Sequence, residues 1–174
     1  MIRELADAVR EADNIVALTG AGMSVESDIA PFRGKGGLWE KFDPEEYAHI
    51  ESFRMNPLRS WELFKLQIQE IVDAEPHPGY HALVELESHG LRSIITQNID
   101  GLHSKAGSQE VIELHGTLFK LRCGDCGGKR DTSDHLSSIK KGKVPCCECG
   151  AYLRPDVVMF GEPLPGLKWR GLWS

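Results

Sequence analysis

Apolar residues follow helical spacing in some segments of the chain and form uninterrupted runs in others. Helical spacing predicts a helix over Ile2–Ala12, and the apolar run after it predicts a buried strand over Asn14–Thr19. Asn56-Pro57 is typical of a helix start, because Asn can cap the first turn and Pro fits within it. One face of the helix that follows carries an apolar stripe, formed by Trp61, Phe64, Ile68, Ile71 and Val72.

The rest of the pattern alternates helices with short strands, which is typical of an α/β fold with a parallel sheet. The remaining predicted elements are a glycine-rich loop over Ala30–Phe42, a helix over Tyr80–His89, and strands over Arg92–Thr96, Glu110–Leu114 and Asp156–Phe160. Gly20-Ala21-Gly22 follows the first strand directly, where backbone N–H groups could hold a pyrophosphate. Taken alone, such a pair of glycines also fits any tight turn.

Polar residues follow the second and third of these predicted strands. Gln97, Asn98 and Asp100 lie at the carboxyl end of the second strand, where doubly wound sheets bind ligands. Capping of a turn by Asn and Asp explains the same residues equally well. His115 follows the third strand and could serve as a general base near neutral pH, or it could have a structural role.

All five cysteines lie within one short stretch, inside a segment over Leu121–Tyr152 that is poor in large apolar residues. Cys123-Gly-Asp-Cys126 and Cys146-Cys-Glu-Cys149 form two C-x2-C pairs, each followed by glycine and separated from one another by 19 residues. Four thiolates so arranged suit a tetrahedral Zn²⁺ ion, which we expect to hold this segment together. Iron in the same cage and thiol redox chemistry remain alternatives. Cys147 is expected to be a free thiol, although it could replace Cys146.

Composition narrows the function classes further. The chain has 174 residues and a net charge of −6, which fits one domain with a small insert and argues against direct nucleic-acid binding. The basic residues around the cysteines fit a solvated surface, and no apolar run reaches the ~18 residues of a membrane span. Met1–Asn14 does not resemble a signal peptide. Because clustered cysteines fit a metal site in a reducing compartment, we expect a cytoplasmic protein.

In their order and separations, these motifs resemble the sirtuin family of NAD-dependent protein-lysine deacylases. The resemblance runs from Ile2 to about Pro165 and covers Gly20–Arg33, Thr96–His103, His115-Gly116, both cysteine pairs and Arg154–Glu162. It implies an α/β fold with a Rossmann-like parallel sheet and a small four-cysteine zinc-binding module. The implied organisation is an NAD-binding portion over 1–120 with a helical insert near 42–75, the zinc module over 121–152, a return to the Rossmann and substrate-binding strand over 153–165, and an atypical tail over 166–174.

The resemblance also implies a role for each matching residue. The catalytic residues would be His115, as the general base on the ribose hydroxyls, with Asn98 and Asp100. The NAD-binding residues would be Gly20, Ala21, Gly22, Ser24, Phe32, Arg33, Gln97, Asn98, Ile99, Asp100 and His115. An acyl-lysine protein or peptide would bind along Val158, Phe160, Gly161 and Glu162, and structural zinc would bind Cys123, Cys126, Cys146 and Cys149.

The implied reaction removes acetyl groups from protein lysines and yields nicotinamide and O-acetyl-ADP-ribose. Members that prefer acidic acyl groups carry a Tyr and an Arg where this chain has Phe64 and Gln67, so we expect an acetyl or apolar acyl group here. Two other functions remain open. The chain could bind zinc and peptide with little or no turnover, or it could transfer ADP-ribose to protein.

Two departures from the family pattern bear on stability and cofactor affinity. Asp28, Ala30 and Pro31 replace a usual Gly, Pro, and Asp or Thr, and Asp28 would tolerate a positive φ at some cost. Beyond Pro165 we expect no resemblance, so that the second half of the Rossmann sheet would be missing. An open sheet edge, uncovered apolar helix faces, marginal stability and weak NAD binding would follow.

Overall fold

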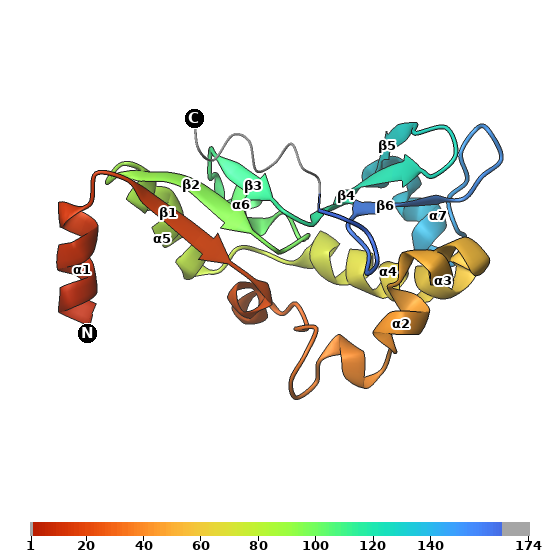
Figure 1. The fold of residues 1–174 in the computed structure, drawn as a ribbon, viewed down its shortest axis with the longest axis horizontal. Helices are drawn as coiled ribbons and strands as arrows, with labels where there is room; N and C mark the ends of the chain where they lie inside the picture. Colours follow the sequence, from red (N-terminus) through yellow and green to blue (C-terminus); the bar gives the residue numbers. More distant parts are fainter. Residues whose placement is uncertain (1, 165–174) are drawn as a thin grey trace.

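The computed structural model describes residues 2–164 and places them around two neighbouring three-stranded sheets (Figure 1). The first sheet is parallel, in the order β1 (Ile15–Thr19), β2 (Leu91–Thr96) and β3 (Val111–Glu113). The second is antiparallel, in the order β5 (Lys129–Asp131), β4 (Gly116–Cys123) and β6 (Leu153–Val157). An α/β fold with a parallel sheet is therefore confirmed.

Four helices accompany the parallel sheet. They are α1 (Ile2–Glu11), the 3-10 helix η1 (Ala21–Ser27), α5 (Pro78–Glu87) and α6 (Leu102–Ala106). The helices α1 and α5 begin close to where the apolar pattern predicts them, whereas η1 and α6 were not predicted. Pro78 occupies the first turn of α5, and the His77 side chain accepts a hydrogen bond from the backbone N–H of Gly79. This cap explains why the helix starts before Tyr80, where the apolar pattern alone places its beginning.

The predicted helical insert contains the short helix η2 and three α-helices. These are η2 (Leu38–Glu40), α2 (Pro44–Tyr47), α3 (Ile50–Met55) and α4 (Pro57–Asp73). The apolar stripe of α4 is buried at Trp61, Phe64, Ile68 and Ile71, as its spacing predicts. These side chains form the largest apolar core among the described residues.

The zinc module shares that core with the helical insert. Its elements include η3 (Thr132–His135) and α7 (Leu136–Lys140), which lie beside β4. Leu121, Ile139 and Leu153 are fully buried against the α4 stripe, and the Trp61 indole N–H donates to the Leu153 carbonyl at 2.8 Å. Packing against α4 therefore supports the module in addition to the ion that we expect to hold it together.

The module's sheet also extends beyond the boundaries that we expected. β4 begins at Gly116, and β6 covers Leu153–Val157 and pairs with β4 in an antiparallel ladder. The segment after the cysteines therefore continues the antiparallel sheet. This differs from our expectation that 153–165 returns to the parallel sheet. The strand-like residues over Asp156–Phe160 indicated a strand but could not indicate its partner.

One face of β1 is open to solvent. Val16 and Leu18 are 52% and 68% exposed, while the alternate residues Ile15, Ala17 and Thr19 are half-buried. β1 also lies at the edge of its sheet, and α1 at the end of the molecule buries none of its residues (Figure 1). Among residues 2–164, β1 is thus an edge strand with one exposed face, whereas parallel sheets are ordinarily covered on both faces.

Asp28 has the backbone conformation that we considered for it. Its φ of 61° lies in the left-handed region, and it is the one non-glycine residue of 2–164 with a positive φ. The residue ends η1, and its N–H donates to the Val25 carbonyl. Asp tolerates this conformation better than most residues but less well than glycine.

Candidate functional site

A cavity of about 450 Å³ lies at the carboxyl ends of the parallel strands, between them and the core of α4 and β6. A smaller recess of about 30 Å³ adjoins it, and Ala21, Phe32, Gln67 and Ile99 line both. Its position is the one at which open parallel sheets bind ligands. The cavity is mostly apolar, and its polar lining residues come from several elements: Arg33, Gln67, Gln97, His115 and Glu162.

The recess brings together three of the polar residues that we predicted for the site. Ser24, Asn98 and Asp100 line it, and all three are buried. The Ser24 hydroxyl donates to an Asp100 carboxylate oxygen at 2.6 Å, and the Asn98 amide donates to Ser24 Oγ at 2.9 Å and to the Gly20 carbonyl at 3.0 Å. These contacts join the segment after β1 to the loop after β2. Asn98 and Asp100 therefore do more than cap a turn.

The predicted glycine turn, Gly20-Ala21-Gly22, contributes only one residue to the walls of the two cavities. Ala21 lines both cavities, whereas Gly20 and Gly22 line neither. Gly20 precedes η1 with no side-chain cap on the first N–H groups of that helix, and a Cβ on Gly22 would meet no atom within 4 Å. Uncapped N–H groups with open space beside them fit a pyrophosphate, so the residues present fit a dinucleotide.

His115 lies on the wall of the large cavity with one ring nitrogen already engaged. Its Nδ1 is 2.9 Å from the Gln97 carbonyl oxygen, which can only accept a hydrogen bond. Nδ1 therefore donates its proton there, and in the neutral form of the ring Nε2 is the nitrogen left without a proton. This tautomer is the one that a general base facing the cavity requires.

The predicted loop over the cavity carries an aromatic cluster. Phe32 stacks on Trp39 with ring centroids 5.2 Å apart, and Trp39 contacts Phe160 at 6.0 Å. All three rings line the large cavity together with Arg33. Trp39 was absent from our predicted site, because a single Trp in a glycine-rich loop carries no spacing signal.

The predicted substrate segment lies along the opposite wall. Val158, Phe160, Gly161 and Glu162 all line the cavity. The backbone of Phe160 is already paired with the loop before α3, through Phe160 N–H to the Ala48 carbonyl and Ile50 N–H to the Phe160 carbonyl.

The Glu162 carboxylate is engaged within the protein. It accepts hydrogen bonds from Arg154 at 2.6 Å, from Arg122 at 3.0 Å and from the backbone N–H of Met159 at 3.0 Å. Because Arg154 is 3% exposed, its guanidinium needs this carboxylate as a partner. Glu162 thus shapes the cavity wall through these contacts.

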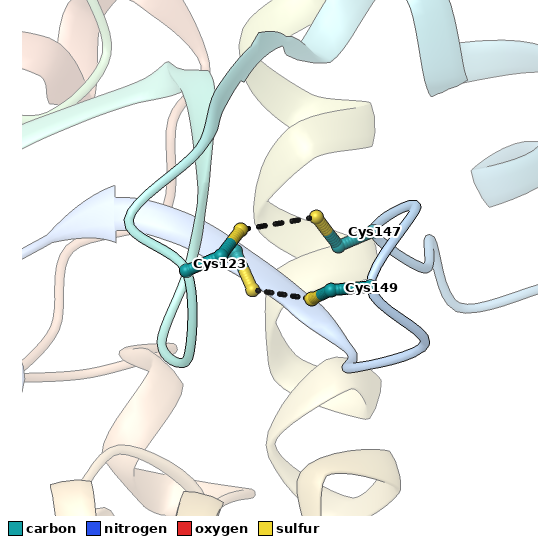
Figure 2. Close-up of side chains that lie close together, drawn as sticks. Cys123, Cys147 and Cys149 are labelled. Carbon is teal, nitrogen blue, oxygen red and sulfur yellow. Dashed lines mark hydrogen bonds between the residues drawn. The ribbon is translucent and has the colours of Figure 1, made fainter.

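The structure corrects one of the four predicted metal ligands. The sulfurs of Cys123, Cys126, Cys147 and Cys149 lie within 4.8 Å of one another, whereas Cys146 is outside the cluster. Figure 2 shows the Cys147 and Cys149 side chains reaching from one loop toward Cys123. Cys146 pairs with Tyr152 in an isolated antiparallel bridge. Adjacent residues in extended backbone point to opposite sides, so Cys147 faces the cluster and Cys146 faces solvent.

The cluster fits a tetrahedral zinc site. Cys123 and Cys149 are 3.5 Å apart at sulfur, as are Cys126 and Cys147, and all five cysteines are free thiols. A disulfide would need about 2.05 Å, whereas four thiolates around zinc at about 2.3 Å lie roughly 3.8 Å apart. Backbone N–H groups of Cys126 and Asp125 lower the pKa of the Cys123 thiol to about 7. This thiol therefore loses its proton to a metal ion more readily than an ordinary cysteine.

Three polar residues behind the recess, of which Tyr80 and His103 are buried and Thr19 is half-buried, were not among the predicted site residues. Thr19, Tyr80 and His103 come from β1, α5 and α6 and contact one another or the recess residues. Burial lowers the pKa of His103, and the Asp100 carboxylate only partly offsets this effect. Their spacing in the chain gives no common motif, since the fold alone brings them together.

Comparisons with known proteins agree with this geometry. A family model described as the Sir2 family matches residues 20–174. An NAD-dependent protein deacylase of Pyrococcus abyssi is 49% identical over 169 residues, covering 95% of this chain and 68% of the relative. The chain belongs to the Sir2 family. The match of the family model includes 166–174, which differs from our expectation of an atypical tail, and those residues lie outside the described part of the structure.

Other Sir2-family proteins give the same result in sequence and in structure. An Archaeoglobus fulgidus protein named NAD-dependent protein deacylase 2 is 47% identical over 94% of this chain. A solved complex of a Sir2 homologue with NAD has a TM-score of 0.86 and 40% identity, and covers 97% of this chain and 66% of that one. The chain thus spans about two thirds of the length of these relatives. Among its described helices, none has the length and apolar character needed to cross a membrane.

Proposed function

We propose that this Sir2-family chain removes acetyl groups from protein lysines in an NAD-dependent reaction that yields nicotinamide and O-acetyl-ADP-ribose. The observation that carries the proposal is the cavity, which combines a free base nitrogen on His115 with the polar recess of Ser24, Asn98 and Asp100. The names of the relatives support it, since they are NAD-dependent protein deacylases and deacetylases.

Residues on one wall of the cavity would bind the cofactor, and residues on the other would bind the acyl-lysine. Bound NAD would supply the ribose that accepts the acetyl group and the nicotinamide that leaves. Ala21, Ser24, Asn98 and Asp100 would hold the cofactor, and His115 would take a proton at Nε2. Apolar Phe32 and Ile99 line both cavities and would exclude water from the reacting atoms.

The acyl-lysine would enter along the apolar wall. A Sir2 protein solved with a deacetylated peptide and an acetylated ADP-ribose is 34% identical to this chain, which supports a peptide substrate. Phe64 and Gln67 line the cavity and are 3% and 6% exposed, so the position where a cation could bind an acidic acyl group holds an amide. We propose acetyl or apolar acyl groups as substrates, with succinyl-lysine a much poorer one.

The testing experiment incubates the purified chain with NAD and an acetyl-lysine peptide and follows O-acetyl-ADP-ribose by mass spectrometry. His115→Ala should abolish the product, whereas His89→Ala should not, because His89 is exposed at the end of α5 and bonds only within that turn. A succinyl peptide of the same sequence tests the acyl preference. Product in the wild type and in His89→Ala alone supports the proposal.

Two other results would contradict it in distinguishable ways. ADP-ribose attached to protein, without O-acetyl-ADP-ribose, would indicate an ADP-ribosyltransferase. No product from a folded chain that holds one zinc ion would indicate a zinc- and peptide-binding protein without turnover. We also propose a cytoplasmic location, which the five free thiols support.

A further inference from the structure

Tyr80 lies directly behind the recess and lines neither cavity. Its side chain is fully buried, and its hydroxyl is 3.1 Å from Ser24 Oγ. The first turn of α5 is also tied to η1 by His77, whose Nε2 is 2.8 Å from the Met23 carbonyl oxygen. The position of the phenol relative to Ser24 is therefore fixed by a second contact between the same two elements.

The hydrogen bonds around Ser24 determine which group must donate. A serine hydroxyl has one proton and two acceptor positions. The proton goes to Asp100 at 2.6 Å, and the Asn98 amide fills one acceptor position at 2.9 Å. The remaining contact, with Tyr80, can be satisfied only if the phenol donates its proton to Ser24.

This pattern also orients Asn98. One amide hydrogen goes to Ser24 Oγ and the other to the Gly20 carbonyl, so Oδ1 is the atom that Asn98 can offer to a ligand in the recess. If Ser24 rotated, one of these amide bonds would be lost and the amide could turn. The direction of the Ser24 hydroxyl therefore sets which groups the recess presents.

The far side of the Tyr80 ring is held by a chain of buried and half-buried contacts. His103 meets the ring edge to face with centroids 4.7 Å apart, and its Nε2 is 2.9 Å from Thr19 Oγ1. Thr19 donates to Thr96 Oγ1, which also accepts the backbone N–H of Asn98. The contacts thus form a closed circuit from Ser24 through Tyr80, His103, Thr19 and Thr96 to Asn98.

We propose that Tyr80 is a positioning residue of the cofactor site, whose hydroxyl holds Ser24 against Asp100 and thereby fixes the Asn98 amide that faces NAD. The inference rests on the proposed function, because it assigns the recess to the cofactor. Burial raises the pKa of Tyr80 to about 12, so the phenol keeps the proton that this role requires.

The test is a double-mutant cycle on NAD binding, measured by calorimetry with the purified chain. Tyr80→Phe should weaken binding about tenfold, as loss of one buried hydrogen bond would. In a Ser24→Ala background, Tyr80→Phe should cause no further loss, because Tyr80 acts through Ser24. Wild-type affinity in Tyr80→Phe, or a loss that adds fully to that of Ser24→Ala, would overturn the proposal.

Trp61→Phe is the matched control for destabilisation. It also removes one hydrogen bond from a fully buried aromatic side chain, that of Trp61 to Leu153, but in the core shared with the zinc module, and Trp61 lines neither cavity. It should lower the thermal midpoint and leave the affinity for NAD unchanged. Equal losses of affinity in Trp61→Phe and Tyr80→Phe would mean that reduced stability explains both, and the proposal would be wrong.

A second readout needs no cofactor. The chain has three tyrosines, so ¹³Cζ labelling gives three signals, from Tyr47, Tyr80 and Tyr152. Ser24→Ala should move the Tyr80 signal alone, and an unmoved signal would overturn the contact itself. A wild-type chain that binds no NAD would overturn the proposed function. If the wild type binds NAD and Tyr80→Phe binds it with the same affinity, only this inference would be overturned.

Discussion

Replacing Cys147 and Cys146 one at a time tests the corrected metal site directly. The two residues are adjacent, yet Cys147 is 8% exposed and within the sulfur cluster, whereas Cys146 faces solvent. Cys147→Ser should therefore remove a zinc ligand, and Cys146→Ser should leave all four ligands in place. The pair is matched, because the same atom is changed at neighbouring positions.

The magnitude follows from the number of ligands. Zinc contributes about 10–16 kcal/mol in four-ligand zinc-finger peptides, so equal sharing assigns about 3 kcal/mol to each ligand. Loss of one ligand should then weaken zinc binding roughly 150-fold. The unfolding temperature should fall as well, because the Cys147 side chain belongs to the core shared with α4.

Competition with a chromophoric chelator measures the affinity, and metal analysis gives the stoichiometry. The expected result is one zinc per chain at wild-type affinity for Cys146→Ser and a large loss for Cys147→Ser. The reasoning is refuted if Cys146→Ser loses the metal and Cys147→Ser retains it. It is equally refuted if both single variants retain zinc and only the double variant loses it, because the two sulfurs would then be interchangeable.

Three further predictions follow from other features. Asp28→Gly should stabilise the fold by about 0.5–1 kcal/mol in urea unfolding, because Asp28 has a φ of 61°, whereas Asp28→Val should destabilise it. Leu18→Thr should reduce self-association in light scattering and change stability by less than about 0.5 kcal/mol, since Leu18 is 68% exposed; unchanged association would contradict this. Tyr80 has a pKa raised from 10.0 to about 12, so the unfolded chain releases this proton first and stability should fall as pH rises from about 10 to 12, a loss that Tyr80→Phe should lack.

Local sequence patterns predicted the strands and helices that carry the site, but not which strands pair or which elements pack together. The strand over Asn14–Thr19 follows from its apolar run, although none of its residues is fully buried, and the apolar stripe of α4 follows from helical spacing. Periodicity does not contain strand order. It therefore could not place β6 beside β4, nor show that the zinc module shares a core with α4.

The candidate site was predictable wherever its residues lie together in the chain. Gln97, Asn98 and Asp100 form one short segment, and their unusual polarity after a buried strand drew attention to them. Tyr80 and His103 reach the same place from separate helices, so no spacing reveals them. The Cys146 error has a local cause, because two adjacent cysteines fit nearly the same motif and only the backbone direction chooses between them.

The uneven distribution of the core has a consequence for how the molecule opens. The larger core joins α3 and α4 to the zinc module, whereas a much smaller cluster around Tyr80 and Leu102 lies beside the parallel sheet. Amide hydrogens of β1 should therefore exchange with solvent sooner than those of α4 and β4, through partial unfolding of the sheet alone. A ligand in the recess would contact Ser24 and Asn98 beside the parallel sheet and Ile71 and Leu118 of the larger core, so its binding would slow that exchange and make the two parts unfold together.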